Sequence, residues 1–296
     1  MTYSIVACEL ETGQLGVAVQ TFNLATGTYV PFAAPGIGAV ATQALVERSY
    51  GPKGLDLIRE GKTAQDALAY LLELDPKHDF RQVSIVDYRG NVAIHTGKRC
   101  FPEAGYYVGD CFSTQANMMR FSGVWNAMAE AYQGAKGDLA SRLLIALDAA
   151  EAAGGDLRGK QSAALLVVSD ESDFPIVDLR VDHHPEPLLE LKRLLRLHRA
   201  YTAERMIADL VSAGDIEKAS ILLDQIKDWA YDEPYLQYLR ALHLAGHLDR
   251  VNVAVPILKD LINESPIWGE YLRREANIDN FGCPGLGNYL LSLLKV

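Results

Sequence analysis

The residue with the clearest chemical potential is Thr2, which directly follows the initiator methionine. A methionine before a small residue is of the type normally removed after synthesis, and its removal would expose the α-amine of Thr2. An α-amine has a pKa of about 7.7–8, so at neutral pH it can act as general base for the hydroxyl of the same residue. Thr2 is therefore a candidate N-terminal nucleophile. The alternative is an ordinary second residue, with Ser4 as the nearest competing hydroxyl and without an obvious base.

The segment after Thr2 has the pattern of a β-hairpin. Residues 3–9 are predicted to form a strand, and residues 15–20 its partner across the turn at 11–13. Such a strand would hold the nucleophile rigidly at the edge of a sheet. Further strands are predicted at 28–32, 37–41, 82–87, 91–95, 106–108, 111–115, 162–169 and 176–181, and helices at 51–61, 63–75, 122–132 and 139–153.

Strands and helix pairs thus alternate in blocks along the first part of the chain. Two sheets enclosed between two pairs of helices is the simplest packing that buries every apolar face. The nearly continuous apolar strand at 163–168 also fits a sheet that is covered on both sides. We therefore predict an α+β fold, a four-layer αββα sandwich, over residues 1–184.

The rest of the chain is predicted to be helical. Residues 183–187 contain two prolines within three positions, which is typical of an extended linker. Two similar Gly-containing motifs begin at Gly214 and Gly246, 32 residues apart, which is close to the period of about 34 residues of tetratricopeptide repeats. We predict an all-α, tetratricopeptide-like domain over residues 185–296. Its helices are expected at 188–195, 203–213, 215–229, 233–245, 249–264, 266–276 and 290–294.

The helical domain suggests partners of two kinds. Helical repeats usually bind a protein or peptide or mediate oligomers, and we expect a homodimer, although such helices could also merely cap the sandwich. Four aromatic side chains could line a concave groove, but aromatic residues at helical spacing are more often core. These residues are Trp229, Tyr235, Tyr238 and Trp268.

Composition excludes several functional classes. The formal net charge of −10 disfavours nucleic acid as a partner. The longest apolar stretches are too short for a membrane helix, and the N-terminus lacks a secretory signal, so we expect a cytoplasmic protein. The four cysteines form no C-x-x-C pair, and His243 and His247, although four residues apart, lack a third ligand, so no metal site is predicted. No nucleotide-binding glycine motif occurs, and no cofactor is expected.

Five blocks of sequence, in order, carry a resemblance to a known family. They span residues 1–7, 36–44, 50–55, 95–97 and 154–164. Over roughly residues 1–182 the chain resembles a bacterial domain-of-unknown-function family placed in the N-terminal-nucleophile (Ntn) hydrolase superfamily. That resemblance implies an αββα sandwich and hydrolysis of amide bonds. Threonine proteases of the superfamily keep a lysine on an early strand, whereas this sequence has none before Lys53, which favours a small-molecule amide substrate over a peptide.

The superfamily comparison implies two further catalytic residues. In the threonine-protease relatives the oxyanion hole lies near the position of Gln43, which implies the backbone N–H groups of Gln43 and Ala44 as donors. A turn glutamine that bonds its own backbone is an equal alternative. Asp156 follows a helix end and could orient the N-terminal ammonium and tune its pKa, or it could form a structural salt bridge with Arg158.

Other polar residues in or near these blocks, or on a neighbouring predicted strand, are candidates for substrate binding. His95 ends a strand, where a histidine is more often structural than a base. Gln115 and Asn117 could donate amide hydrogen bonds to an oxyanion or a carboxylate, and Asn117 would equally suit a helix N-cap. The remaining candidates are Arg48 for an anionic group, Arg158, and Gln161 and Ser162, which either contact substrate or close a turn.

Two functions follow from these observations. The first is an amidohydrolase that cleaves a small amide bond through Thr2 after Met1 is removed. The second is a non-catalytic binding protein, in which the sandwich is a scaffold and the helices recruit a partner.

Overall fold

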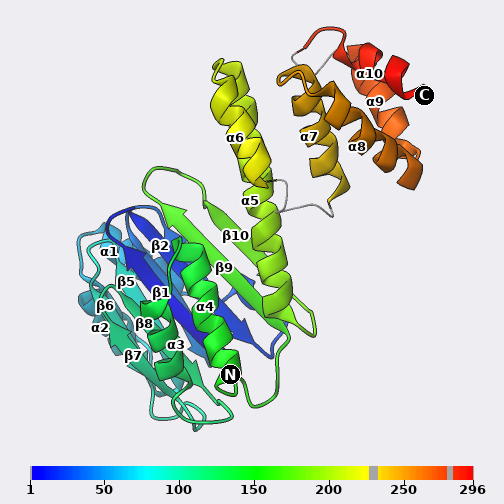
Figure 1. Cartoon of the computed structure of the whole chain (residues 1–296). Helices are drawn as coiled ribbons and strands as arrows, with labels where there is room; N and C mark the ends of the chain where they lie inside the picture. The colour runs from blue at the N-terminus through cyan, green and yellow to red at the C-terminus, as the bar shows by residue number, and fades with distance from the viewer. Residues whose placement is uncertain (1, 227–232, 279–282, 296) are drawn as a thin grey trace. The chain divides into compact units, whose positions relative to one another are not determined.

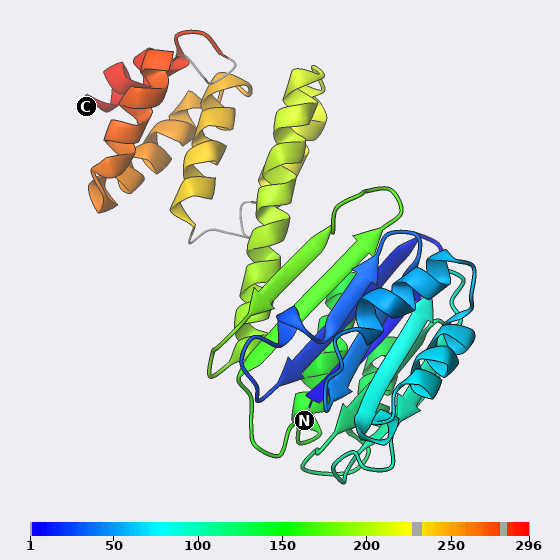
Figure 2. The same ribbon diagram turned by 180° about the vertical axis from the view of Figure 1, so that it is seen from behind.

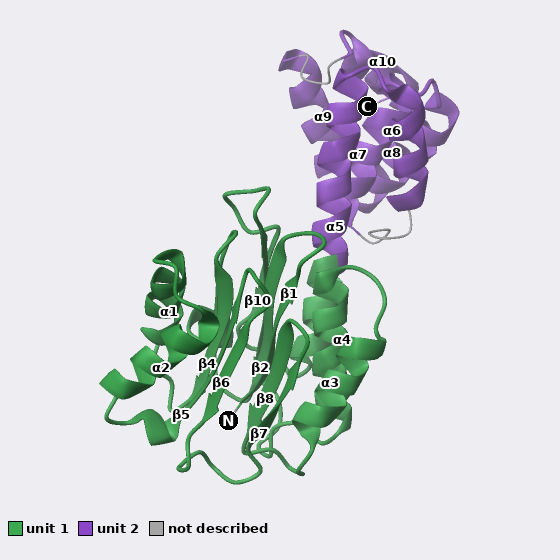
Figure 3. Cartoon of the chain, turned by 90° about the vertical axis from the view of Figure 1, so that its left-hand side faces the viewer, with its two compact units in different colours: residues 1–195 green, residues 196–296 purple. Residues whose placement is uncertain are grey.

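The computed structural model describes residues 2–226, 233–278 and 283–295. The chain divides into two compact units, Met1–Leu195 and Arg196–Val296 (Figure 3). The boundary falls inside helix α5 (Pro187–Ser212) and not in the linker at 183–187 that the prolines predicted. The reason is packing, because Leu188, Leu191 and Leu195 of α5 are buried in the core of the first unit.

The first unit contains two antiparallel sheets (Figure 1). The six-stranded sheet has the order β10-β9-β2-β1-β8-β7, and the four-stranded sheet the order β3-β4-β5-β6. The strands are β1 (Thr2–Glu9), β2 (Gln14–Thr21), β3 (Pro31–Ala34), β4 (Gly38–Ala44), β5 (Arg81–Asp87), β6 (Val92–Thr96), β7 (Gly105–Gly109), β8 (Phe112–Asn117), β9 (Ser162–Ser169) and β10 (Val177–Val181).

A pair of helices covers the outer face of each sheet. Helices α1 (Tyr50–Arg59) and α2 (Ala64–Leu74) lie against the four-stranded sheet (Figure 2). They bury Val83 and Ile85 of β5. Helices α3 (Val124–Gly134) and α4 (Leu139–Ala152) lie against the six-stranded sheet. Figure 3 shows the two helix pairs on opposite sides of the two sheets.

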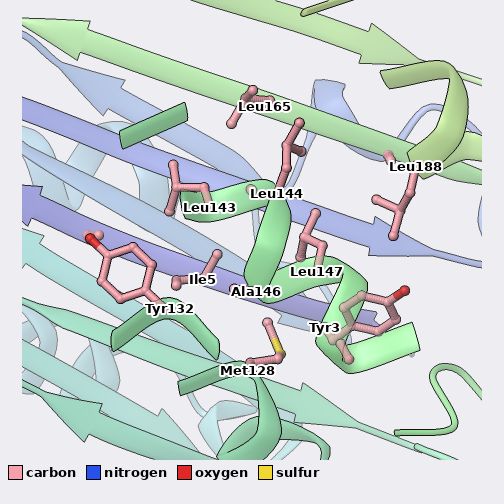
Figure 4. Packing of buried hydrophobic residues seen from close by; sticks show 14 of the residues in the cluster. Tyr3, Ile5, Met128, Tyr132, Leu143, Leu144, Ala146, Leu147, Leu165 and Leu188 are labelled. Atoms are coloured by element: carbon pink, nitrogen blue, oxygen red, sulfur yellow. The ribbon is translucent and has the colours of Figure 1, made fainter. Parts of the chain in front are cut away.

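Three apolar cores hold these layers together. Beneath α3 and α4, Ile5 and Leu165 of the sheet meet Met128 and Leu147 of the helices (Figure 4). A second core lies beneath α1 and α2. The third contains residues of both sheets, Val6, Val17, Ala41 and Val86 among them, and therefore fills the space between the sheets. Each of these side chains is removed from water, which is the main driving force for the layered packing.

Local sequence explains where the helices begin. Thr63 caps α2 by accepting a hydrogen bond from the backbone N–H of Asp66, and Asp138 caps α4 through the N–H of Ser141. Such caps satisfy N–H groups that the first helical turn leaves unpaired. One predicted strand begins late: residues 26–28 form a short 3-10 helix, and strand β3 starts only at Pro31.

The second unit is helical throughout its described residues. The helices predicted separately at 188–195 and 203–213 form the single helix α5, in which no glycine or proline interrupts the interior. The others are α6 (Ile216–Ile226), α7 (Pro234–Gly246), α8 (Val251–Glu264), α9 (Ile267–Ile278) and α10 (Leu286–Leu294), around a core that includes Tyr238, Leu258 and Leu290. Trp229, an expected groove residue, lies outside the described residues.

In the second unit Tyr238 is fully buried, with Trp268 stacked on its ring at 5.6 Å. These two aromatic residues are therefore core residues, while the neighbouring Tyr235 is partly exposed. Within the described residues of the whole chain, none of the helices has the length and apolar character needed to cross a membrane.

Candidate functional site

Strand β1 directs its polar residues between the two sheets. Tyr3, Ile5 and Ala7 belong to the core under α3 and α4, whereas Val6 and Cys8 belong to the core between the sheets. Because successive side chains of a strand alternate, Thr2 and Ser4 share the inward side with Val6 and Cys8. The candidate nucleophile therefore lies at one end of the space between the sheets.

Hydrogen bonds hold both the hydroxyl and the carbonyl oxygen of Thr2. It exposes 3% of its surface, and its Oγ1 donates a hydrogen bond to Thr21 Oγ1 at 3.2 Å. The side-chain amide nitrogens of Gln43 and Asn117 both approach Thr2 O, at 3.1 and 3.4 Å. Two amides and one hydroxyl thus fix the position and orientation of Thr2.

The nitrogen of Thr2 faces strand β8. The backbone N–H of Cys8 donates to Cys111 O just before β8, and N–H groups alternate between the two sides of a strand. The N–H of Thr2, six residues earlier, therefore also points toward β8, where Asn117 is its register partner. The Oδ1 atom of Asn117 is buried and has no hydrogen-bond partner among the described residues.

Gln43 belongs to a buried network of side-chain amides. Its Nε2 donates to Gln82 Oε1 at 2.7 Å as well as to Thr2 O, and its Oε1 accepts from Ser4 Oγ at 2.8 Å. Gln115 Nε2 donates to Ser4 Oγ, and Asn117 Nδ2 donates to Gln82 Oε1 at 3.0 Å. These residues expose at most 1% of their surface, so the network lies in the interior.

At the end of β4, one of the two N–H groups expected to bind an oxyanion is not directed at strand β5. Thr42 N–H donates to Val30 O, away from β5, and Leu45 N–H donates to Phe80 O on the opposite side. Alternation therefore turns the N–H of Ala44 away from β5, as it does that of Thr42. Ala44 has a positive φ of 70°, an uncommon conformation for a residue other than glycine. Of the two N–H groups expected to bind an oxyanion, only that of Ala44 has this direction.

Hydrogen bonds connect Asp156 to the segment that follows Thr21. Its oxygens accept hydrogen bonds from Phe22 N–H at 3.1 Å and from the guanidinium and backbone of Arg158. Arg158 also donates to Asn23 Oδ1, and Asn23 Nδ2 donates to Thr21 Oγ1. Asp156 thus forms the ion pair with Arg158 that the sequence offered as its structural role, and it anchors the segment that binds Thr2 Oγ1.

A cavity of about 390 Å³ adjoins this cluster. Asn117, the register partner of Thr2, lines it together with Arg158 and Ala44, whereas Thr2 is not among its lining residues. Its other walls come from Leu45 and from the segments on either side of β5 and β6, through Phe80, Arg99, Cys100 and Phe101. The cavity provides space for a small molecule beside the residue opposite Thr2.

Three of the other predicted residues support neighbouring segments. Ser162 is buried and accepts from Thr26 N–H while donating to Asn23 O, and Gln161 N–H donates to Thr21 O. Both therefore hold the chain after β2. The Arg48 guanidinium lies 5.4 Å from the Tyr29 ring centre. Burial raises the pKa of the Tyr29 phenol, and the charges of Arg48 and Arg158 oppose that rise.

His95 lies apart from the cluster. It pairs in register with Val83, whose side chain is buried beneath α1 and α2, so His95 shares the outer face of the four-stranded sheet. Its Nε2 is 2.9 Å from His78 O, and the two imidazole rings stack at 6.0 Å. The structure therefore does not bring His95 together with Thr2.

Three residues of the site were missed in the sequence. Gln82 joins Gln43 to Asn117, Thr21 binds Thr2 Oγ1, and Arg99 lines the cavity. A signal for Gln82 did exist, because it is a polar residue on the same side of the predicted strand as Ser84 and Val86. Thr21 and Arg99 carried no comparable signal, since both lie where a strand or loop ends.

Two histidines of the second unit, His243 and His247, contact polar neighbours. His243 Nε2 is 3.2 Å from Glu204 Oε1, and His247 Nδ1 is 3.4 Å from Cys283 Sγ. Burial lowers the pKa of His247 and raises that of Cys283, which favours the neutral forms of both groups. Within the part of the chain that the structure describes, no three His, Cys, Asp or Glu side chains are arranged to hold a metal ion.

Comparison with known proteins identifies the family. Residues 2–191 match the family described as "Family of unknown function (DUF1028)", and the chain belongs to that family. Among solved structures, the chain is similar to protein SPO2555 from Silicibacter pomeroyi, whose description also names DUF1028. The two share 33% identity with a TM-score of 0.62, over 66% of this chain and 88% of the other. No curated protein matches the chain.

Proposed function

We propose that the first unit is an Ntn-type αββα sandwich that hydrolyses a small amide bond, with Thr2 as nucleophile once Met1 has been removed. The observation that carries this proposal is the way residue 2 is held. Two buried amides bind its carbonyl oxygen, and a buried hydroxyl binds its Oγ1, beside a cavity. Such fixed placement is what nucleophilic catalysis requires of its attacking group.

The freed amine would lie beside Asn117, whose side chain carries a hydrogen-bond acceptor. Removal of Met1 turns the Thr2 nitrogen into an amine that faces Asn117, whose buried Oδ1 lacks a partner. A buried acceptor without a partner costs about 1–3 kcal/mol, and an amine hydrogen bond would offset that cost. This acceptor supports an amine at residue 2 in the working protein.

The reaction would proceed through an ester on Thr2. Thr2 Oγ1 attacks the amide carbon, while its own amine takes the hydroxyl proton and passes it to the leaving nitrogen as the C–N bond breaks. Water then attacks the ester with the same amine as base, which releases the acid and restores Thr2. The Ala44 N–H supplies a donor for the oxyanion. Gln43, Gln82 and Asn117 act as positioning residues.

The second unit would serve as a tetratricopeptide-like repeat that binds a protein or peptide or forms a homodimer. Its support is the spacing of the two Gly motifs and the stacked aromatic side chains, of which Tyr235 is partly exposed. Size-exclusion chromatography with light scattering tests the dimer. A monomeric mass at micromolar concentration would contradict it.

The test of the enzymatic proposal is covalent labelling. The intact mass of the protein from its native host should lack methionine, and a β-lactone probe should acylate the N-terminal peptide at Thr2. Thr2→Ala should lower the labelling rate by about a thousandfold or more, as removal of a nucleophile does in hydrolases. Thr2→Ser should retain labelling, and peptide mapping of the acylated protein distinguishes Thr2 from the neighbouring hydroxyl of Ser4. Retained methionine together with absent labelling would leave the non-catalytic binding function instead.

A further inference from the structure

The cavity beside Thr2 has an unusual charge for this protein. The chain carries a net charge of −10, yet the cavity lining contains two arginines and no Asp or Glu. A second cavity of about 440 Å³, between α1 and α2, has the opposite character, since Glu47, Asp56, Glu60 and Asp75 line it with a single lysine. The positive charge beside Thr2 is therefore local.

Of the two arginines that line the cavity, Arg99 is the one whose charge can bind a ligand. Arg158 is committed to Asp156, whereas Arg99 has no carboxylate within ion-pair distance among the described residues. The Arg99 guanidinium lies over the Phe80 ring, 5.1 Å from its centre. An arginine stacked on an aromatic ring keeps its fork of N–H donors free in the plane, where a carboxylate can be bound in bidentate fashion.

The loop that carries Arg99 is held by its backbone. Gly97 N–H donates to Arg81 O at 2.9 Å, and Arg99 N–H donates to Asp79 O at 2.8 Å. Gly97 permits this close approach, because a Cβ at that position would lie 2.2 Å from Asp79 O. Arg99 is thus presented to the cavity by a fixed loop.

The rest of the lining is apolar and partly open. Leu45 and Phe101 expose 51% and 61% of their surfaces, which is high for large apolar side chains, and both line the cavity. An exposed apolar rim around a few polar groups is typical of small-molecule sites. The apolar rim and the free guanidinium together fit a ligand that has both a hydrocarbon group and an anionic group.

We infer that the substrate is an anionic amide of the N-acyl amino acid class, whose carboxylate binds Arg99 while its apolar group contacts Leu45 and Phe101. This inference rests on the proposed function for the reaction, but the binding of the carboxylate is independent of it. Asn117, the register partner of Thr2, lines the same cavity, so a ligand held by Arg99 would lie beside a residue that contacts Thr2.

The experiment compares N-acyl amino acids with their uncharged N-methylamides. Turnover should favour the acids by about tenfold or more, because a charge-assisted hydrogen bond is lost with the carboxylate. Arg99→Gln should raise KM for the acids by about the same factor and leave the neutral amides unchanged. Arg89→Gln is the matched control, because its guanidinium also lies over an aromatic ring, 4.9 Å from the centre of Tyr88, but outside the cavity.

Equilibrium binding to the Thr2→Ala protein tests the ligand class separately from the proposed hydrolysis. If no amide is hydrolysed but this variant binds the acids in an Arg99-dependent way, the proposed reaction is wrong and the ligand class stands. If neutral amides are hydrolysed as well as the acids, the reaction stands and the ligand class is wrong. Absence of any Arg99-dependent binding of the acids overturns the inference in either case.

Discussion

The two ends of the space between the sheets are filled by different kinds of side chains. At one end, Cys8 of β1, Ala39 of β4 and Val86 of β5 form an ordinary apolar core. At the other end, the inward positions of the same strands hold Ser4, Gln43 and Gln82, all buried and hydrogen-bonded. The backbone framework is continuous, so only the side chains differ between the two ends.

The inward side chains change from apolar to polar at one register position in each sheet. Val6 pairs in register with Ser113, and Ala41 pairs with Ser84 across the other sheet. Ser84 and Ser113 hydrogen-bond each other between the sheets at this level. Buried amides gain little net stability over hydrocarbon and cost much when a partner is missing. The polar end is therefore better explained by the need to position Thr2 than by stability.

The strongest test of this difference is Gln43→Met, which keeps the side-chain length and removes the amide. Three partners would lose a hydrogen bond, namely Thr2 O, Ser4 Oγ and Gln82 Oε1. We expect the free energy of unfolding to fall by about 3 kcal/mol, since each unsatisfied buried group costs about 1–3 kcal/mol and some retain other partners. Chemical denaturation measures this loss.

The same variant should also slow β-lactone labelling of Thr2 by about a hundredfold, because a displaced nucleophile loses its alignment. Labelling is measured under conditions in which the variant is folded. A variant that loses stability but labels at the wild-type rate would show that the amide network has no role in positioning.

The matched variant at the apolar end is Val86→Ala, on the same strand as Gln82. Val86→Ala removes two buried methyl groups and should lower the free energy of unfolding by about 2 kcal/mol. The labelling rate of the folded protein should remain that of wild type, because Thr2 and its partners are untouched. A large fall in labelling with Val86→Ala would contradict the division of this space into a structural and a functional end.

Much of the fold was predictable because its signals are local. Period-two alternation located nearly all strands, and cap residues such as Thr63 located the helices. Two local predictions differed from the structure. The strand expected at 28–32 begins at Pro31, and two expected helices are one, because no glycine or proline interrupts the interior of α5.

The candidate site was predictable only in part. Thr2 and Gln43 stand out by residue type and by the blocks in which they occur, and Asn117 stands out by residue type alone. Their contacts do not, because Asn117 meets Thr2 across 115 positions of sequence through the pairing of β1 with β8. The role of Gln82 and the entry of Arg99 into the cavity likewise depend on long-range register. Local patterns thus identify candidates, and strand pairing decides which of them meet.

Cys8 makes the apolar end sensitive to alkaline pH. Burial, with a contribution from Cys111, raises the pKa of the Cys8 thiol from its ordinary value of 9.0 to about 11. Between these values the folded state holds the proton that the unfolded state has lost, so stability is present below pH 9 and is lost as pH rises toward 11. The expected loss is about 2 kcal/mol.

Cys8→Ala should lack this part of the alkaline loss, which is measured as the difference between the unfolding free energies at pH 8 and pH 11. Comparison with wild type cancels the ionisation of buried tyrosines such as Tyr132, whose pKa burial raises to about 12. Equal alkaline losses in the two proteins would mean that the thiol is not desolvated, and that this end of the space is wetter than the apolar core implies.

The smallest effect is expected at the level where the two ends meet. Ser84→Ala alone leaves Ser113 Oγ buried without its partner and should cost about 1–2 kcal/mol. The double variant Ser84→Ala with Ser113→Ala removes both hydroxyls and should be nearly neutral, because neither is left unsatisfied. A double-mutant cycle measured by denaturation gives the coupling free energy. Additive losses would indicate that the hydroxyls do not depend on each other, and the change in chemistry would then begin at Ser4 and Gln43.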